Sequence, residues 1–121
     1  MAADPTDHLP LPDLTLHVLL ALAEGPLHGW AVVKRIEGLT QGRKSPSSGS
    51  LYLAIVRLED RGLLEEVPQP EGVDSDDERR RYHRLTPLGH RVLAAEIRRL
   101  SGLVEVARGA GVAAGRGATG G

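Results

Sequence analysis

Hydroxyl and cationic side chains are concentrated in two parts of the sequence. The first part runs from a Ser/Lys-rich turn into a segment with helical periodicity, and its polar members are Lys44, Ser47, Ser48, Ser50 and Arg57. The second part is an arginine-rich stretch that contains Arg79, Arg80, Arg81 and Arg84. Free amides and serine hydroxyls at a helix start bind phosphate oxygens, and an arginine fork binds phosphate or guanine. The two parts therefore predict contacts to DNA, with simple N-capping as the alternative role for the serines.

The segment from residue 48 to residue 61 has the pattern of an amphipathic helix that ends at Gly62. Its core face has apolar residues at i, i+3, i+4 and i+7, namely Leu51, Ala54, Ile55 and Leu58. The opposite face carries Tyr52, Leu53, Val56 and Arg57. In a major groove, Leu53 and Val56 would contact thymine methyls while Arg57 binds guanine or phosphate. Burial of the two apolar side chains against another protein is the alternative.

The remaining elements follow from periodicity and from turn-forming residues. They are helices over 14–23 and 28–39, a strand over 63–67, a loop over 68–79, a return strand over 80–85, and a helix from Pro87 to about residue 108 with Thr86 as its cap. This order is that of a winged helix-turn-helix followed by a long C-terminal helix. The predicted fold class is mainly α with a small β-hairpin (α+β), although periodicity alone does not exclude another small α+β domain.

The last helix carries a second pattern that concerns assembly. Its apolar residues Leu93, Ile97, Leu100 and Val104 are spaced by four, three and four residues, as in the seam of a coiled coil. A helix of this length extends beyond the core of a small domain. The four residues therefore predict a dimer interface rather than packing on the same chain. The chain then divides into a flexible N-terminal segment (1–12), a winged-helix DNA-binding domain (13–86), a dimerisation helix (87–108) and a disordered Gly/Ala tail (109–121).

Charge and aromatic content narrow the kind of nucleic acid that the chain is expected to bind. The net charge of −1 at first argues against binding to a polyanion such as DNA. However, residues 1–27 carry four acidic side chains and no Lys or Arg, so much of the negative charge lies away from the arginines in the sequence. The local electrostatic field around the arginines matters more for DNA binding than the net charge of the whole chain. Acids between residues 71 and 78 either swing clear of DNA or partly neutralise these arginines. The three aromatic rings, Trp30, Tyr52 and Tyr82, are too few for a platform that stacks single-stranded bases.

Several other functions are not expected from this sequence. The five histidines lack metal-ligand spacing and no cysteine accompanies them, so neither a metal nor another cofactor is predicted. No nucleophile elbow, phosphate-binding glycine loop or pair of acids on one face indicates an enzyme. The apolar runs are too short to span a bilayer, so no membrane partner is expected and a cytoplasmic location is the default.

Three stretches of the sequence resemble a known family. They are residues 19–30 (LLALAEGPLHGW), residues 49–52 with 57–63 (GSLY and RLEDRGL), and residues 81–86 (RYHRLT). In this order and spacing, the chain resembles the PadR-like transcriptional regulators over about residues 14–90. The resemblance implies a dimeric bacterial repressor with a winged-helix domain, which in some members releases DNA when a small molecule binds. Trp30 stands where the family usually has Tyr, and His83 where a second aromatic residue is common.

These observations lead to one interpretation and one alternative. The chain is interpreted as a homodimeric repressor that binds a palindromic double-stranded operator and responds to an unidentified small-molecule effector. The third helix reads the major groove, the hairpin contacts phosphates or the minor groove, and the last helix forms the dimer, while Trp30 is expected in the core. The alternative is a winged-helix protein-interaction module that does not bind DNA. Binding to duplex DNA that weakens steeply with salt distinguishes the two.

Overall fold

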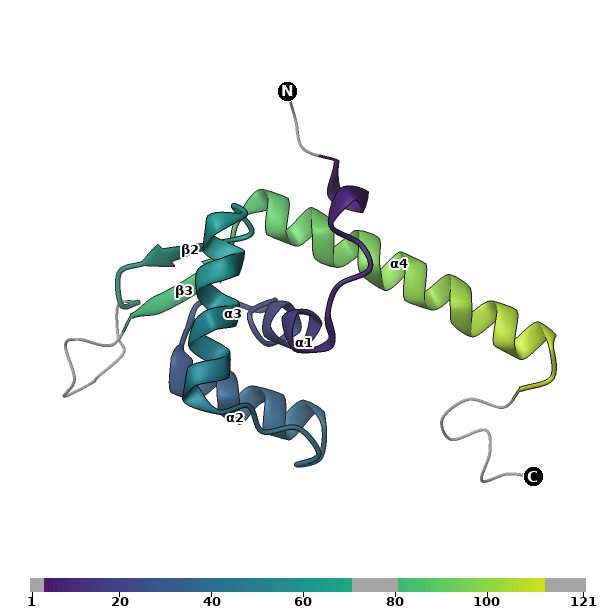
Figure 1. Ribbon diagram of the computed structural model, residues 1–121, viewed down its shortest axis with the longest axis horizontal. Helices are drawn as coiled ribbons and strands as arrows, with labels where there is room; N and C mark the ends of the chain where they lie inside the picture. Colours follow the sequence, from purple (N-terminus) through teal and green to yellow (C-terminus); the bar gives the residue numbers. More distant parts are fainter. Residues whose placement is uncertain (1–3, 71–80, 113–121) are drawn as a thin grey trace.

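The computed structural model of this chain describes residues 4–70 and 81–112. Its elements, in chain order, are η1 (Pro5–His8), α1 (Asp13–Ala21), β1 (Leu27–His28), α2 (Gly29–Leu39), α3 (Ser48–Asp60), β2 (Leu64–Val67), β3 (Tyr82–Leu85) and α4 (Pro87–Gly109). Figure 1 shows α1, α2 and α3 gathered beside the strands β2 and β3, whereas α4 extends away from this body. The arrangement is the predicted mainly helical α+β fold of a winged helix-turn-helix.

The core lies where the first three helices meet. α3 contributes the face predicted from its periodicity, Leu51, Ala54, Ile55 and Leu58, all of them buried. α1 and α2 add four residues with no exposed surface, Val18, Leu19, Val32 and Ile36. Burial of an aliphatic side chain of this size contributes about 1.5–3 kcal/mol. This packing fixes the rotation of α3 about its axis and so determines which residues face solvent.

The predicted hairpin is confirmed, and a third strand joins it. β2 and β3, called the wing below, run antiparallel with Leu64 opposite Leu85. β1 pairs with the other edge of β3, which gives the strand order β1-β3-β2. No strand is predicted for residues 27 and 28 from the sequence, because an alternation of period two cannot show in two residues. The additional pairing attaches the start of α2 to the wing.

The N-terminal segment is packed, although the sequence predicts a flexible segment over residues 1–12. η1 contacts α4, and Leu11 is only 9% exposed. The backbone N–H of Leu11 donates a hydrogen bond to Oε2 of Glu96 at 2.9 Å. The prediction weighed the prolines and polar residues of this segment and neglected Leu9 and Leu11, which pack on the core. Residues 1–3 lie outside the described residues.

The start of α4 is docked on the turn between α3 and β2. Thr86 caps the helix as predicted, because its Oγ1 accepts a hydrogen bond from the backbone N–H of Gly89 at 3.0 Å. The same hydroxyl donates to the carbonyl oxygen of Gly62 at 2.6 Å. Gly89 approaches the backbone so closely that a Cβ there would lie 2.1 Å from the carbonyl oxygen of Leu63. This contact sets the direction in which α4 leaves the domain.

The four predicted interface residues of α4 fall into two groups. Leu93 is 7% exposed and belongs to the core of its own chain, which corrects its assignment to the dimer seam. Ile97 and Val104 are 40% and 38% exposed, and Leu100 is half-buried. One apolar stripe continues from the docked half of the helix into the projecting half, and its spacing does not show where the core ends. Of the predicted tail, residues 113–121 lie outside the described residues.

Candidate nucleic-acid interface

The outward face of α3 mixes apolar and polar side chains. Tyr52 and Leu53 are 63% and 54% exposed, Val56 is half-buried, and Arg57 is exposed. These are the residues that the periodicity places opposite the core. Arg57 borders a hollow of about 300 Å³ between α1 and α3. Exposed apolar groups beside a cation suit a major groove, where thymine methyls and guanine acceptors lie on neighbouring base edges.

Serine side chains cap the start of α3. The hydroxyl oxygen of Ser47 accepts a hydrogen bond from the backbone N–H of Ser50 at 3.1 Å and donates to the Ser50 hydroxyl at 3.0 Å. The N-capping role considered for the serines is therefore present. Ser47, Ser48 and Ser50 are all exposed, so the first turn of α3 is accessible to a phosphate oxygen as well.

Lys44 has an acidic partner in α1. Its Nζ lies 2.6 Å from Oδ2 of Asp13. The hydrogen bond from Lys44, with a smaller effect of His17, holds the pKa of Asp13 below its usual value. Pro12 occupies the N-cap position of α1, and the Asp13 side chain at the first position of the helix reaches the loop before α3. The ion pair with Asp13 thus attaches the loop before α3 to α1 and partly neutralises the charge of Lys44.

The described wing arginines pair with glutamates on the neighbouring strand. Nε of Arg84 lies 2.8 Å from Oε2 of Glu65, which is its cross-strand partner in the sheet. NH1 of Arg81 lies 4.0 Å from Oε1 of Glu66. Exposed ion pairs of this kind contribute about 0–1 kcal/mol, so a phosphate can displace the carboxylates. The predicted contacts Arg79 and Arg80 lie outside the described residues.

Two buried side chains of β3, Tyr82 and His83, join the wing to β1 and α3. Tyr82 is 5% exposed, and its ring meets that of His28 edge to face, with centroids 5.4 Å apart. His83 is 7% exposed, and its Nδ1 lies 3.2 Å from Oε2 of Glu59 on α3. The sequence predicts no contact between His83 and Glu59, because no local pattern relates positions 24 residues apart. The pair holds the wing at a defined distance from the outward face of α3.

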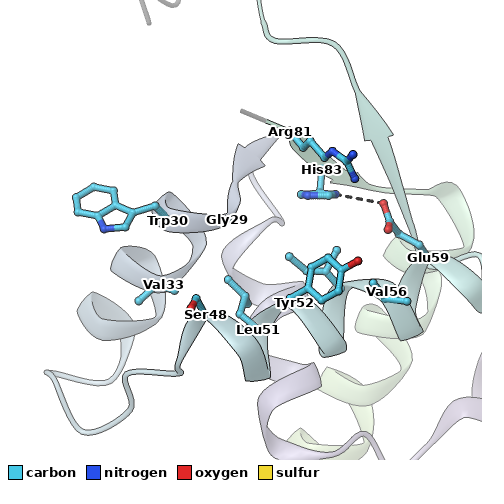
Figure 2. Close-up of a pocket in the computed structure, with 11 residues that line it drawn as sticks. Gly29, Trp30, Val33, Ser48, Leu51, Tyr52, Val56, Glu59, Arg81 and His83 are labelled. Atoms are coloured by element: carbon cyan, nitrogen blue, oxygen red, sulfur yellow. Dashed lines mark hydrogen bonds and ion pairs between the residues drawn. The ribbon is translucent and has the colours of Figure 1, made fainter. Parts of the chain in front are cut away.

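A pocket of about 450 Å³ opens between the start of α2, α3 and β3 (Figure 2). Trp30 lies at its α2 side and is 65% exposed, which corrects the expectation of a core tryptophan. The ammonium group of Lys34 stands 5.0 Å from the centre of its ring, a cation–π contact one helical turn away. An apolar residue of an amphipathic helix such as α2 is not always buried. The packing of α2 against α3 determines which face of α2 lies in the core.

Residues 4–70 and 81–112 contain no cluster of three or more His, Asp or Glu side chains that is able to hold a metal ion. No helix in the same ranges is both long and apolar enough to cross a membrane.

The sequence matches the "Transcriptional regulator PadR-like family" over residues 18–95. This range contains α2, α3 and the wing, and reaches into the docked half of α4. The chain therefore belongs to the PadR-like family, whose members are transcriptional regulators and not enzymes.

A curated protein is similar to most of this chain. An "Uncharacterized 37.1 kDa protein in transposon TN4556" of Streptomyces fradiae is 40% identical over 95 residues, which cover 76% of this chain and 25% of that protein. The chain spans about a quarter of the length of the curated relatives it matches.

Solved structures share the fold. A transcriptional regulator from Clostridium thermocellum superposes with a TM-score of 0.64 at 25% identity, covering 78% of this chain and 86% of that one. Bacillus subtilis PadR in complex with operator DNA gives a TM-score of 0.58 at 19% identity, covering 71% of this chain and 47% of that one. At this level of identity, the second likeness concerns the fold alone.

Proposed function

We propose that this chain binds double-stranded DNA sequence-specifically, with α3 in the major groove and the wing on the sugar-phosphate backbone. The observation that carries the proposal is the exposed face of α3, where Tyr52, Leu53 and Arg57 stand free of the core. Family membership supports it, and the B. subtilis PadR that shares this fold was solved with operator DNA. The proposed contacts are Lys44, Ser47, Ser48, Ser50, Tyr52, Leu53, Val56, Arg57, Arg79, Arg80, Arg81 and Arg84.

The proposal includes a homodimer that acts as a repressor. The projecting half of α4 carries exposed Ile97 and Val104 with half-buried Leu100 between them, a stripe that a second copy of the helix would cover. A two-fold axis places the two α3 helices on half-sites about one helical turn, roughly 34 Å, apart. The expected operator is therefore a palindrome, and a small molecule that weakens its binding would act as the effector.

Selection of bound duplexes from a random pool tests the proposal directly. We expect a palindromic sequence whose affinity falls steeply with salt concentration. Arg57→Ala should weaken binding to the selected duplex by about 1–3 kcal/mol, because a paired contact to guanine is worth that much. Arg108→Ala, which removes the same charge at the far end of α4, is the matched control. Enrichment of no sequence, or equal affinities of the Arg57 variant and the unchanged chain, would refute sequence reading by α3.

A protein-interaction module is the second candidate, and the paired wing arginines favour it. Arg81 and Arg84 both have glutamate partners, and Leu53 is an apolar side chain in the middle of the exposed α3 face. Such a module would bind duplex DNA weakly and without a preferred sequence. The selection experiment therefore separates the two candidates.

A further inference from the structure

The hollow between α1 and α3 combines an apolar lining with two cationic side chains. Its volume is about 300 Å³. Leu14 and Leu53 belong to the apolar part of its lining, and Arg57 and Arg61 belong to the polar part. None of the described residues that line the hollow is acidic. The field of the two guanidinium groups is therefore not cancelled within the hollow, and it favours an anionic group there.

The two arginines of the hollow differ from those of the wing in their partners. Arg57 and Arg61 are exposed, and neither forms an ion pair with any residue in the ranges 4–70 and 81–112. Arg81 and Arg84 of the wing both have glutamate partners. A phosphate that binds at the wing has to displace a carboxylate, whereas one that binds in the hollow displaces only water and counterions. The hollow is thus the less hindered of the two places for a phosphate.

The hollow and the wing lie on opposite flanks of α3. Leu53 and Arg57 line the hollow, Tyr52 and Val56 line the pocket beside β3, and no residue of α3, which is described throughout, lines both. Figure 1 shows the strands β2 and β3 on one side of α3 and α1 on the other. The major groove is bordered by the two sugar-phosphate backbones, so a helix that lies in it has one backbone on each flank. A duplex that meets the wing with one strand would present its other strand to the hollow.

We propose that the hollow binds the sugar-phosphate backbone of the DNA strand opposite the one that the wing contacts. In this arrangement Arg61 and the hydroxyl group of Thr15 donate to a phosphate oxygen, while Leu14 and Leu53 pack against the carbon skeleton of a deoxyribose. The Thr15 hydroxyl has no hydrogen-bond partner within the described part of the chain. The inference rests on the proposed function, because it requires α3 in the major groove, and it adds Arg61 and Thr15 to the DNA-contacting residues.

A salt series with a fluorescent duplex carrying the selected palindrome tests the role of Arg61. Arg61→Ala should weaken binding at least about fivefold and lower the log-log salt slope by about one unit, as expected for one lost phosphate contact. Arg61→Lys keeps the charge and should keep the slope. Arg98→Ala, which removes another exposed arginine without a partner in the described ranges, is the matched control on α4 and should change neither quantity. A slope that Arg61→Ala leaves unchanged overturns the inference.

Replacement of single phosphates by neutral methylphosphonates, one position at a time, identifies the strand. For the unchanged chain, we expect sensitive positions on both strands that border the groove. Arg61→Ala should remove the sensitivity of positions on one strand, because their phosphate has already lost its partner, and Arg84→Ala should do so on the other strand. If Arg61→Ala leaves every position sensitive, or acts on the same positions as Arg84→Ala, the hollow does not hold the opposite backbone.

A variant on α1 distinguishes the hollow from another contact of Arg61. Thr15→Val has nearly the same shape but lacks the hydroxyl donor, so it should weaken binding about two- to tenfold at the positions that Arg61→Ala affects. Urea unfolding controls for the fold, and because both side chains are accessible, the midpoints should match that of the unchanged chain. Full affinity of Thr15→Val places the phosphate outside the hollow. Specific binding that is insensitive to both variants refutes this inference alone, whereas absence of duplex binding at any salt concentration refutes the proposed function as well.

Discussion

The carboxylate of Glu96 on α4 accepts a hydrogen bond from the backbone N–H of Leu11 at 2.9 Å, across 85 positions of sequence. Glu96 is 1% exposed, and its other partner is the Arg99 guanidinium, with 3.1 Å between NH2 and Oε2. A buried carboxylate is stable only when it is paired and hydrogen-bonded, and both conditions are met here. The contact ties the N-terminal segment to α4, so the direction of α4 depends on residues that precede the family match.

Removing this carboxylate is therefore expected to destabilise the fold. Glu96→Ala leaves the buried Leu11 N–H without its partner, which costs about 1–3 kcal/mol in the free energy of unfolding. Glu96→Gln keeps an acceptor oxygen for the Leu11 N–H, so it should lower the free energy of unfolding by less than Glu96→Ala does. Glu105→Ala removes the carboxylate of an exposed pair with Arg108 on the same helix and should change stability by less than about 0.5 kcal/mol. Urea unfolding compares the three, and equal losses for Ala at 96 and 105 would contradict the assigned role.

The same residue makes stability depend on pH in a predictable direction. The hydrogen bond from Arg99, helped by that from Leu11, holds the pKa of Glu96 below its ordinary value. Because the folded-state pKa is lowered, the contribution of Glu96 is fully present above the ordinary carboxyl pKa of about 4.3 and is lost as pH falls through the lowered value. Between pH 7 and pH 3, the unchanged chain should thus lose more stability than Glu96→Gln.

Two glycines of α4 are expected to respond oppositely to the same substitution. Gly89→Ala places a methyl group 2.1 Å from the Leu63 carbonyl oxygen and forces the docked end of α4 to shift, at a cost of about 1–3 kcal/mol. Gly102 has no neighbouring atom within 4 Å of a built Cβ, so Gly102→Ala should stabilise the helix by about 0.5–1 kcal/mol. Thermal melts at one fixed chain concentration measure both. A stabilised Gly89 variant would mean that α4 is not docked on the α3–β2 turn.

The sequence predicts what is local in this fold, and it does so accurately. The core face of α3, the hairpin and the Thr86 cap each depend on spacing or on residue type within a few positions. The outward position of Tyr52 and Arg57 follows from the same periodicity. Contacts between distant positions were missed, as with Leu11 and Glu96 or with Glu59 and His83.

Trp30 and Leu93 show why a sequence pattern alone does not predict which apolar residues are buried in the core of the chain. An apolar stripe on a helix predicts burial, but it does not identify the partner. Leu93 has the spacing of a coiled-coil seam and is buried in its own chain, whereas Trp30 lies on an apolar helix and is 65% exposed. The pocket has no counterpart in any sequence pattern, because three separate elements line it.

Acidic residues of the wing are expected to weaken DNA binding. Glu65→Gln with Glu66→Gln frees Arg84 and Arg81 from their partners and should tighten binding to all duplexes, several-fold at low salt, because phosphates no longer compete with carboxylates. Arg81→Ala with Arg84→Ala should do the reverse and flatten the salt dependence by about one unit of log-log slope per lost phosphate contact. Fluorescence anisotropy across a salt series measures both. A wing that does not touch DNA would leave all the slopes unchanged.

The projecting half of α4 is expected to control the oligomeric state. Ile97→Glu with Leu100→Glu places charges on the stripe that a second copy would cover, and a two-fold axis doubles each substitution. Each aliphatic side chain buried in such an interface is worth about 1.5–3 kcal/mol. Because Val92 and Leu93 stay in the core of the chain, the variant should remain folded and sediment as a monomer.

Loss of the dimer should lower affinity for a palindromic duplex by orders of magnitude, because a monomer engages only one half-site. Val106→Glu is the matched control, since Val106 is 70% exposed and lies off the stripe of Ile97, Leu100 and Val104. It should sediment like the unchanged chain. If the Ile97/Leu100 variant still sediments as a dimer, the chain pairs through another surface, and the stripe on the free half of α4 is not the contact between protomers.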